Sequence, residues 1–139
     1  MEQMVFESVS YVGVCPDCGA QMACRGTQAL VGGRLRWDVE ATCSACGGAA
    51  AVCGGTVPWE RRDQMLSEHG PGRLRVSGSS ATVVAVMRVL RAELGIDLPT
   101  AKAVARRVVT GEYEGTLPEM EHLARKLRQA GITAAATRE

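Results

Sequence analysis

The sequence predicts an α+β protein, in which a small cysteine-rich β module precedes a β-α-α-(β)-α-β two-layer domain. All six cysteines lie within the first 53 of the 139 residues. Residues 1–71 carry five arginines against eight carboxylates, whereas residues 72–139 carry eleven basic residues against seven acidic ones. Apolar residues alternate in much of the first half and recur mainly at helical spacing in the second. We therefore expect two domains, residues 1–71 and 72–139.

Strands account for most of the first domain. Residues 4–12 alternate apolar and polar side chains, which predicts a strand that leads into the first cysteine pair. The clearest strand is RLRWDVEATC, residues 34–43, with apolar side chains on one face and charged side chains on the other. The glycines of the preceding VGG are a turn signal. A hairpin is thus expected to carry the chain from one cysteine pair to the next.

A short helix is expected after Pro58, where Trp59, Met65 and Leu66 would anchor it to the sheet. The run His-Gly-Pro-Gly at residues 69–72 would end this helix, and we expect the domain junction there.

The second domain is predicted to run strand, helix, helix, short link, helix, strand. The first helix has the apolar spacing of TVVAVMRVLRAELG and stops at Gly95. Asp97 is the expected N-cap of the second helix, and Thr116 with Glu119 has the spacing of a capping box for the third. One helical layer on one sheet follows from this order.

Four cysteines have the spacing of a metal site. CPDCG contains Cys15 and Cys18, and CSACG contains Cys43 and Cys46. Two thiolates two residues apart can both reach one ion at about 2.3 Å, and the glycine after each pair permits the tight turn. Two such pairs complete a tetrahedral four-sulfur shell for structural Zn²⁺, with no open position for activated water. The alternative of four reduced, metal-free cysteines leaves a small aromatic-poor module without a staple.

These spacings resemble those of zinc-ribbon proteins over residues 10–55, which implies a zinc-ribbon-like β module. A thioredoxin-like redox site would come once and in a βαβ context, which this stretch lacks. Cys24 and Cys53 are surplus to the four-sulfur shell. We interpret them as small buried residues on equivalent strands. A substitute ligand or a redox-linked pair remains the alternative.

Residues 73–138 resemble the C-terminal domain of the bacterial ribosomal stalk protein, which recruits translational GTPases. The matching segments are TVVAVMRVLRAELGIDLPTAKAVARRVV and LPEMEHLARKLRQAGITAAA. The residues that match the family pattern are Met87, Arg88, Arg91, Gly95, Leu98, Ala101 and Lys102. The sequence departs from the family at Val83 and Pro99, and it has a cysteine module in place of the dimerisation helices and hinge.

The resemblance implies a factor-binding surface at Met87, Arg88, Arg91 and Lys102. Arg106 stands four residues after Lys102 on the same helix and would extend a basic two-helix face. Such a face suits an acidic protein partner. The alternative interpretation is that these residues are ordinary solvent-exposed charges with no role in binding.

A non-enzymatic protein-binding module is the function that these features favour. His69 and His122 stand without a catalytic pattern around them, so we expect no enzyme. The partner would be a translation-associated GTPase or, as an alternative, a toxin that the chain neutralises as an immunity protein. A zinc-ribbon nucleic-acid-binding regulator is the third alternative, which is less favoured because the cysteine half is acidic and the basic half has only Tyr113 for stacking.

The first fourteen residues have no basic leader and no long apolar run, so we expect no signal peptide. No window approaches the eighteen apolar residues of a membrane span. We therefore expect a cytoplasmic protein. In that compartment, close cysteine pairs are interpreted as metal ligands or redox centres in preference to disulfides. The sequence does not indicate an oligomeric state.

Overall fold

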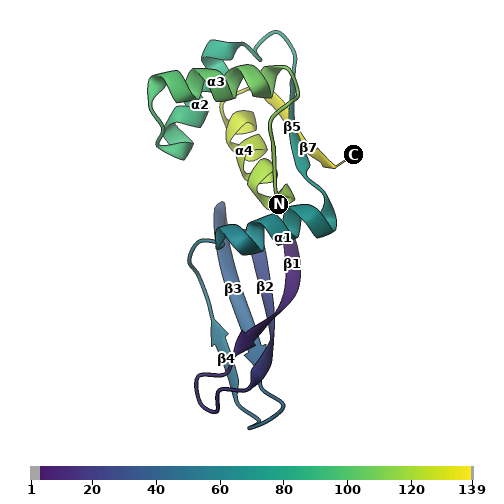
Figure 1. The fold of residues 1–139 in the computed structure, drawn as a ribbon. Coiled ribbons are helices and arrows are strands. Elements are labelled where there is room, and N and C mark those ends of the chain that lie inside the picture. Colours follow the sequence, from purple (N-terminus) through teal and green to yellow (C-terminus); the bar gives the residue numbers. More distant parts are fainter. Residues whose placement is uncertain (1–3, 139) are drawn as a thin grey trace. The chain divides into compact units, whose positions relative to one another are not determined.

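A computed structural model describes residues 4–138 and confirms the α+β class (Figure 1). The chain divides into two compact units, one that ends at His69 and one that begins at Gly70. We call them unit 1 and unit 2 and describe each by itself.

Unit 1 contains a four-stranded antiparallel sheet in the order β1-β2-β3-β4. Its strands are β1 (Val5–Val14), β2 (Gln21–Val31), β3 (Arg34–Thr42) and β4 (Ala49–Val52). The β2–β3 turn has φ of +57° at Gly32 and +77° at Gly33, as a type I′ hairpin turn requires. This is the hairpin that VGG predicts, and it fixes the register of the two longest neighbouring strands.

Helix α1 (Trp59–His69) packs against one face of this sheet, in the place the sequence predicts. The side chain of Met65 is fully buried and forms a small core with Val9 and Trp37. The expectation that Trp59 also anchors the helix is wrong, because its side chain is 71% exposed. Trp59 begins the helix, six residues before Met65, so the two side chains leave the helix in different directions.

Two side chains of α1 also reach the backbone of β1, which is an edge strand of the sheet. The amide of Gln64 donates to the carbonyl of Ser10 (2.8 Å), and Nε2 of His69 donates to the carbonyl of Ser8 (2.7 Å). Unpaired strand edges are sites where another chain can add a strand. The helix therefore occupies part of this edge as well as one face of the sheet.

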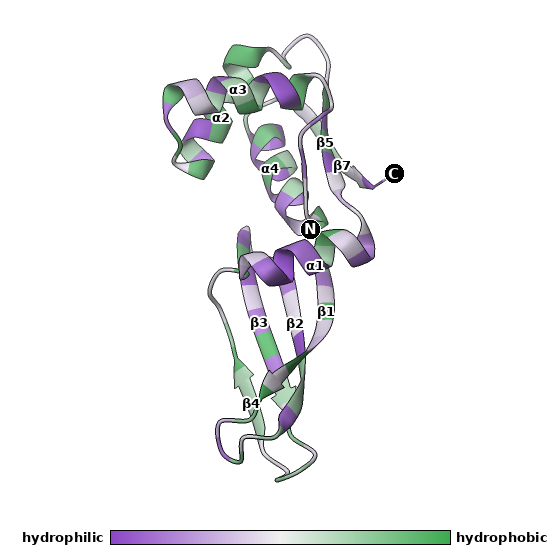
Figure 2. Cartoon of the chain, in the orientation of Figure 1, coloured by the Kyte–Doolittle hydropathy of each residue, from purple (hydrophilic) through white to green (hydrophobic). Residues whose placement is uncertain are grey.

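Unit 2 combines a three-stranded antiparallel sheet, ordered β6-β5-β7, with three helices. Its elements are β5 (Gly72–Ser77), α2 (Val83–Leu94), α3 (Leu98–Val109), β6 (Glu114–Gly115), α4 (Leu117–Gln129) and β7 (Thr133–Arg138). This is the predicted order, with β6 as the expected extended link. Helix α4 contacts β5 and β7, and hydrophobic and hydrophilic residues alternate along it (Figure 2), with Met120, Leu123 and Leu127 buried. The core is built from Leu74, Val86, Leu90, Val108, Met120, Leu123 and Leu127.

The helix ends of unit 2 use the residues that the sequence indicates. The side chain of Asp97 accepts a hydrogen bond from the amide of Thr100 at 2.9 Å. Thr116 and Glu119 form a complete capping box at the start of α4. Gly95 closes α2 with φ of +63°, in the left-handed region that glycine tolerates. These caps satisfy backbone groups that would otherwise lack partners.

We expect the stability of unit 2 to depend on acid pH through Asp97. Its hydrogen bonds with the side chain and backbone of Thr100, and to a smaller extent the charge of Arg91, hold the pKa of Asp97 below its ordinary value. A lowered folded-state pKa means that this contribution is present above the unfolded value of about 3.9 and is lost as the pH falls through the folded value. Asparagine caps a helix about as well as aspartate but carries no charge.

The wild-type chain should therefore have a larger free energy of unfolding than Asp97→Asn above about pH 5, and the difference should be lost as the pH falls through the lowered pKa of Asp97. Urea unfolding followed by circular dichroism at several pH values measures this difference. A difference that stays constant across the range would contradict the titration of Asp97 as its cause.

Candidate metal centre

Two cysteine turns of the same backbone form lie at one end of the unit 1 strands. In the first, residues 15–20, the amide of Cys15 donates to the carbonyl five residues on (2.8 Å), and the amide of Gly19 donates back to Cys15 (2.9 Å). The second turn, residues 43–48, repeats both hydrogen bonds at the same two distances. φ is +77° at Gly19 and +75° at Gly47, so each turn requires the glycine that follows its second cysteine.

The two turns bring four sulfur atoms together. The Sγ atoms of Cys15, Cys18, Cys43 and Cys46 all lie within 4.8 Å of one another. The Sγ of Cys15 is 3.7 Å from that of Cys46, and the Sγ of Cys18 is 3.6 Å from that of Cys43. A tetrahedral shell with metal–sulfur bonds of about 2.3 Å has sulfur–sulfur edges of about 3.8 Å. Zinc fits this centre.

The electrostatics of the cluster also favour a cation. Amides of Cys46 and Ala45 hydrogen-bond the sulfur of Cys43 and lower its pKa to about 7. The pKa of Cys18 is raised to about 11: the amide of Ala20 lowers it, but the thiol of Cys43, burial and the other two thiols together outweigh that amide. Four thiolates this close repel one another, and a divalent cation among them would remove the repulsion.

The centre has an inner and an outer side. Cys15 and Cys43, the first cysteine of each turn, are each 2% exposed and pack with Met22 and Cys24. Cys18 and Cys46, the second of each turn, are exposed. The four cysteines could thus hold one ion at the end of the sheet, close to the protein surface, with all four thiolates as ligands. A zinc ion bound this way would cross-link the ends of two hairpins.

The two surplus cysteines are outside the four-sulfur group and differ from each other. Cys24 is buried in β2, where its Sγ is 3.9 Å from the carbonyl oxygen of Met22. The expectation that Cys53 is equally buried is wrong, because Cys53 follows the exposed strand β4 and is itself exposed, beside Arg36. Neither is part of the four-sulfur group that residues 4–138 contain.

The residues predicted to bind a partner lie on α2 and α3, which pack against each other. Met87 is half-buried against the core of unit 2. The four basic residues, Arg88, Arg91, Lys102 and Arg106, are exposed. Among residues 4–138 no acidic side chain forms a salt bridge with Arg88, Lys102 or Arg106, whereas Arg91 lies near Asp97.

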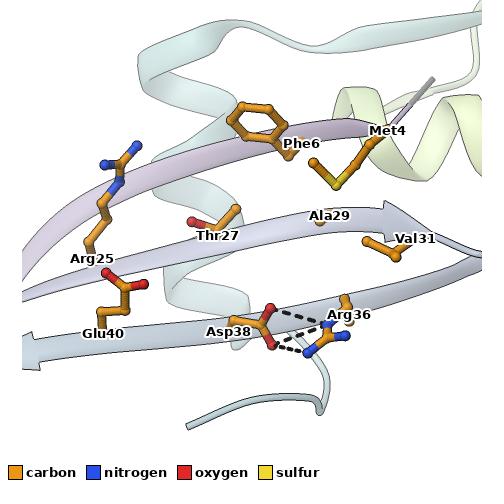
Figure 3. A pocket seen from close by; sticks show the side chains of 9 residues that line it. All are labelled: Met4, Phe6, Arg25, Thr27, Ala29, Val31, Arg36, Asp38 and Glu40. Carbon is orange, nitrogen blue, oxygen red and sulfur yellow. Dashed lines mark hydrogen bonds and ion pairs between the residues drawn. The ribbon is translucent and has the colours of Figure 1, made fainter. Parts of the chain in front are cut away.

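Sequence reasoning did not indicate a groove on the face of the unit 1 sheet that α1 leaves free (Figure 3). Its lining residues are Met4, Phe6, Arg25, Thr27, Ala29, Val31, Arg36, Asp38 and Glu40. The available signal was four apolar residues, Met4, Phe6, Val12 and Val14, at positions whose parity is opposite to that of the buried Val9.

No known family model, curated protein or solved structure matches this chain. The zinc-ribbon-like character of unit 1 accordingly rests on the geometry of the four cysteines. Within the described residues, no helix has the length and apolar character needed to cross a membrane.

Proposed function

We propose that this chain is a non-enzymatic protein-binding module with a structural zinc ion in unit 1. Unit 2 docks an acidic protein partner through a basic two-helix face made of Met87, Arg88, Arg91, Lys102 and Arg106. A translation-associated GTPase is the partner class that the stalk-like segments favour. The zinc ion staples a unit whose own apolar core is small.

The exposed cations of α2 and α3 carry this proposal. Three of the four lack a salt-bridge partner within residues 4–138. Other basic residues of unit 2 are paired, such as Arg73 with Glu114 and Arg125 with Glu121. Unpaired cations on neighbouring helices suit complementary carboxylates on a partner and would accelerate association.

The surroundings of the two histidines support the non-enzymatic part of the proposal. His69 donates to the Ser8 carbonyl within unit 1. His122 lies 2.7 Å from Glu93, which also faces Lys126, and the three join α2 to α4. Neither histidine has a hydroxyl or thiol nucleophile in the hydrogen bonds described, and a closed four-sulfur shell leaves a zinc ion no position for substrate.

Charge reversal tests the docking face. We expect Arg88→Glu/Arg91→Glu to weaken binding of the partner by tenfold or more, and the wild-type affinity to fall as salt is raised. The measurement is affinity purification of the intact chain from its host, followed by titration of the recovered GTPase against purified variants. Arg34→Glu, which reverses one exposed arginine in unit 1, is the matched control for Arg88→Glu.

If the Arg88→Glu/Arg91→Glu variant retained every partner, this result would contradict the assignment of the binding face. Recovery of a toxin in place of a GTPase would show that the partner is a toxin. The assignment of the binding face would be unaffected. Equal loss with Arg34→Glu would mean that net charge, and not this surface, governs binding.

A further inference from the structure

The free face of the unit 1 sheet is more apolar than an exposed sheet face usually is. Phe6, Val12 and Val14 project from β1, Val31 projects from β2, and Met4 stands directly before β1; each has 41–73% of its surface exposed. The register puts the four strand residues on one face, since Phe6 pairs with Ala29 and Val12 with Ala23, both away from the α1 side, and Met4 lines the same groove as Phe6. At the far edge of the sheet, beside β3, the exposed Ala49 and Ala51 of the hydrophobic strand β4 (Figure 2) lie on this same face, since Ala51 pairs with Glu40. We call this surface the open face.

Charges of both signs cross the middle of the open face. Arg25 and Glu40 are direct register partners on β2 and β3, and they project to the same side. They nevertheless form no salt bridge with each other, and Figure 3 shows their side chains apart. Arg36 and Asp38, on the same face, are already paired at 3.1 Å.

This pattern selects among possible occupants. Nucleic acid needs a strongly basic surface with stacking groups, and this face has carboxylates among its arginines and a single aromatic residue, Phe6. A strongly acidic or basic protein would meet a like charge at Glu40 or Arg25. A surface with apolar ends, on which an arginine without a salt bridge is the register partner of a glutamate without one, is complementary to itself under two-fold symmetry.

We propose that the open face is a self-association surface, on which two copies of this chain pack sheet against sheet. In the pair, Arg25 of one copy meets Glu40 of the other, and the apolar residues of β1 become buried between the two sheets. The edge of β1 is occupied by Gln64 and His69, so association by the face is favoured over strand addition at this edge.

The size of the open face predicts how strong the pair is. Three strands of about ten residues, at about 3.3 Å per residue and about 4.8 Å apart, with the short β4, present about 500 Å² per copy. The total of about 1,000 Å² is at the low end for specific interfaces, so we expect a dissociation constant in the micromolar range. The pairing involves unit 1 alone and is independent of the partner proposed for unit 2.

Sedimentation velocity of the zinc-loaded full chain, from about 1 to 300 µM, tests the proposal. We expect a shift from monomer to dimer over this range. Val12→Asp should weaken the dimer by tenfold or more, whereas Val52→Asp, on an equally exposed valine of the opposite face, should leave it unchanged. Zinc content and melting temperature check that each variant is folded.

A second set of variants exchanges charges and leaves the apolar residues unchanged. Arg25→Glu and Glu40→Arg should each weaken the dimer, since each creates like charges across the interface. The double variant Arg25→Glu/Glu40→Arg should restore the wild-type dissociation constant. A chain that stays monomeric at every concentration overturns the proposal. So does a Val52→Asp variant that loses the dimer as fully as Val12→Asp, or a double variant that does not recover.

Discussion

Removal of the metal is expected to unfold unit 1 while unit 2 stays folded. The sheet of unit 1 has one small apolar core around Met65, and its cysteine end has little else to hold it. Structural zinc sites contribute apparent binding free energies of about 10–16 kcal/mol, far more than such a core supplies. Unit 2 has its own larger core and no cysteine.

The chain allows the two units to be followed separately. Both tryptophans, Trp37 and Trp59, belong to unit 1, so their fluorescence reports this unit alone. Three of the four helices described are in unit 2, so circular dichroism at 222 nm mainly reports unit 2. When a strong zinc chelator is added, the unfolding transition followed by tryptophan fluorescence should disappear. Most of the circular dichroism signal at 222 nm should remain.

Single cysteine substitutions sharpen this experiment. Cys15→Ser and Cys43→Ser should reduce bound zinc from about one per chain to near zero and reproduce the effect of the chelator. Cys53→Ser is the matched control, because Cys53 is exposed and lies outside the cluster. A chelated chain with an unchanged tryptophan transition would show that the metal does not stabilise unit 1. Two zinc ions per chain would bring further ligands into the site.

A second large effect is expected at Gly26, in the middle of β2. A Cβ atom there would lie 2.1 Å from the ring of Trp37, which covers this glycine. Gly26→Ala therefore forces the ring away and opens the core that Trp37 forms with Val9 and Met65. We expect a loss in the free energy of unfolding of about 3–5 kcal/mol, the cost of removing a buried aromatic side chain.

Urea unfolding of the zinc-loaded chain measures this loss. Gly13→Ala, in β1 and on the same face of the sheet, is the matched control: its Cβ would lie 3.0 Å from the thiol of Cys24, a milder contact than that of Gly26, so a smaller loss is expected. In a Trp37→Leu background, Gly26→Ala should cost much less than in the wild type, because the ring has gone. Equal losses in both backgrounds would show that the contact with Trp37 is not the cause.

The features predicted correctly from the sequence are those that depend on a few neighbouring residues. Strand alternation, helix spacing and caps such as Thr116 act locally, so the order of the elements could be predicted. The four cysteines could be grouped because the same five-residue pattern occurs twice and each pattern forms the same turn.

The features that were not predicted depend on the tertiary packing of one element against another. Whether Cys53 or Trp59 is buried depends on the reach of α1, which has eleven residues and covers only part of one sheet face. The ring of Trp37 over Gly26 requires the β2–β3 register, which no local pattern of Gly26 reveals. The open face could not be predicted for the same reason, since alternation alone does not say that a second layer is missing.

The hydrogen bonds from α1 to β1 have a consequence for how copies of this chain can polymerise. A fibril that grows by strand addition needs two free edges per subunit, one to receive a neighbour and one to offer. In unit 1 the edge at β4 is short and uncharged, but the carbonyls of Ser8 and Ser10 at the other edge are already occupied. An added strand at β4 would therefore end a chain of subunits instead of extending it.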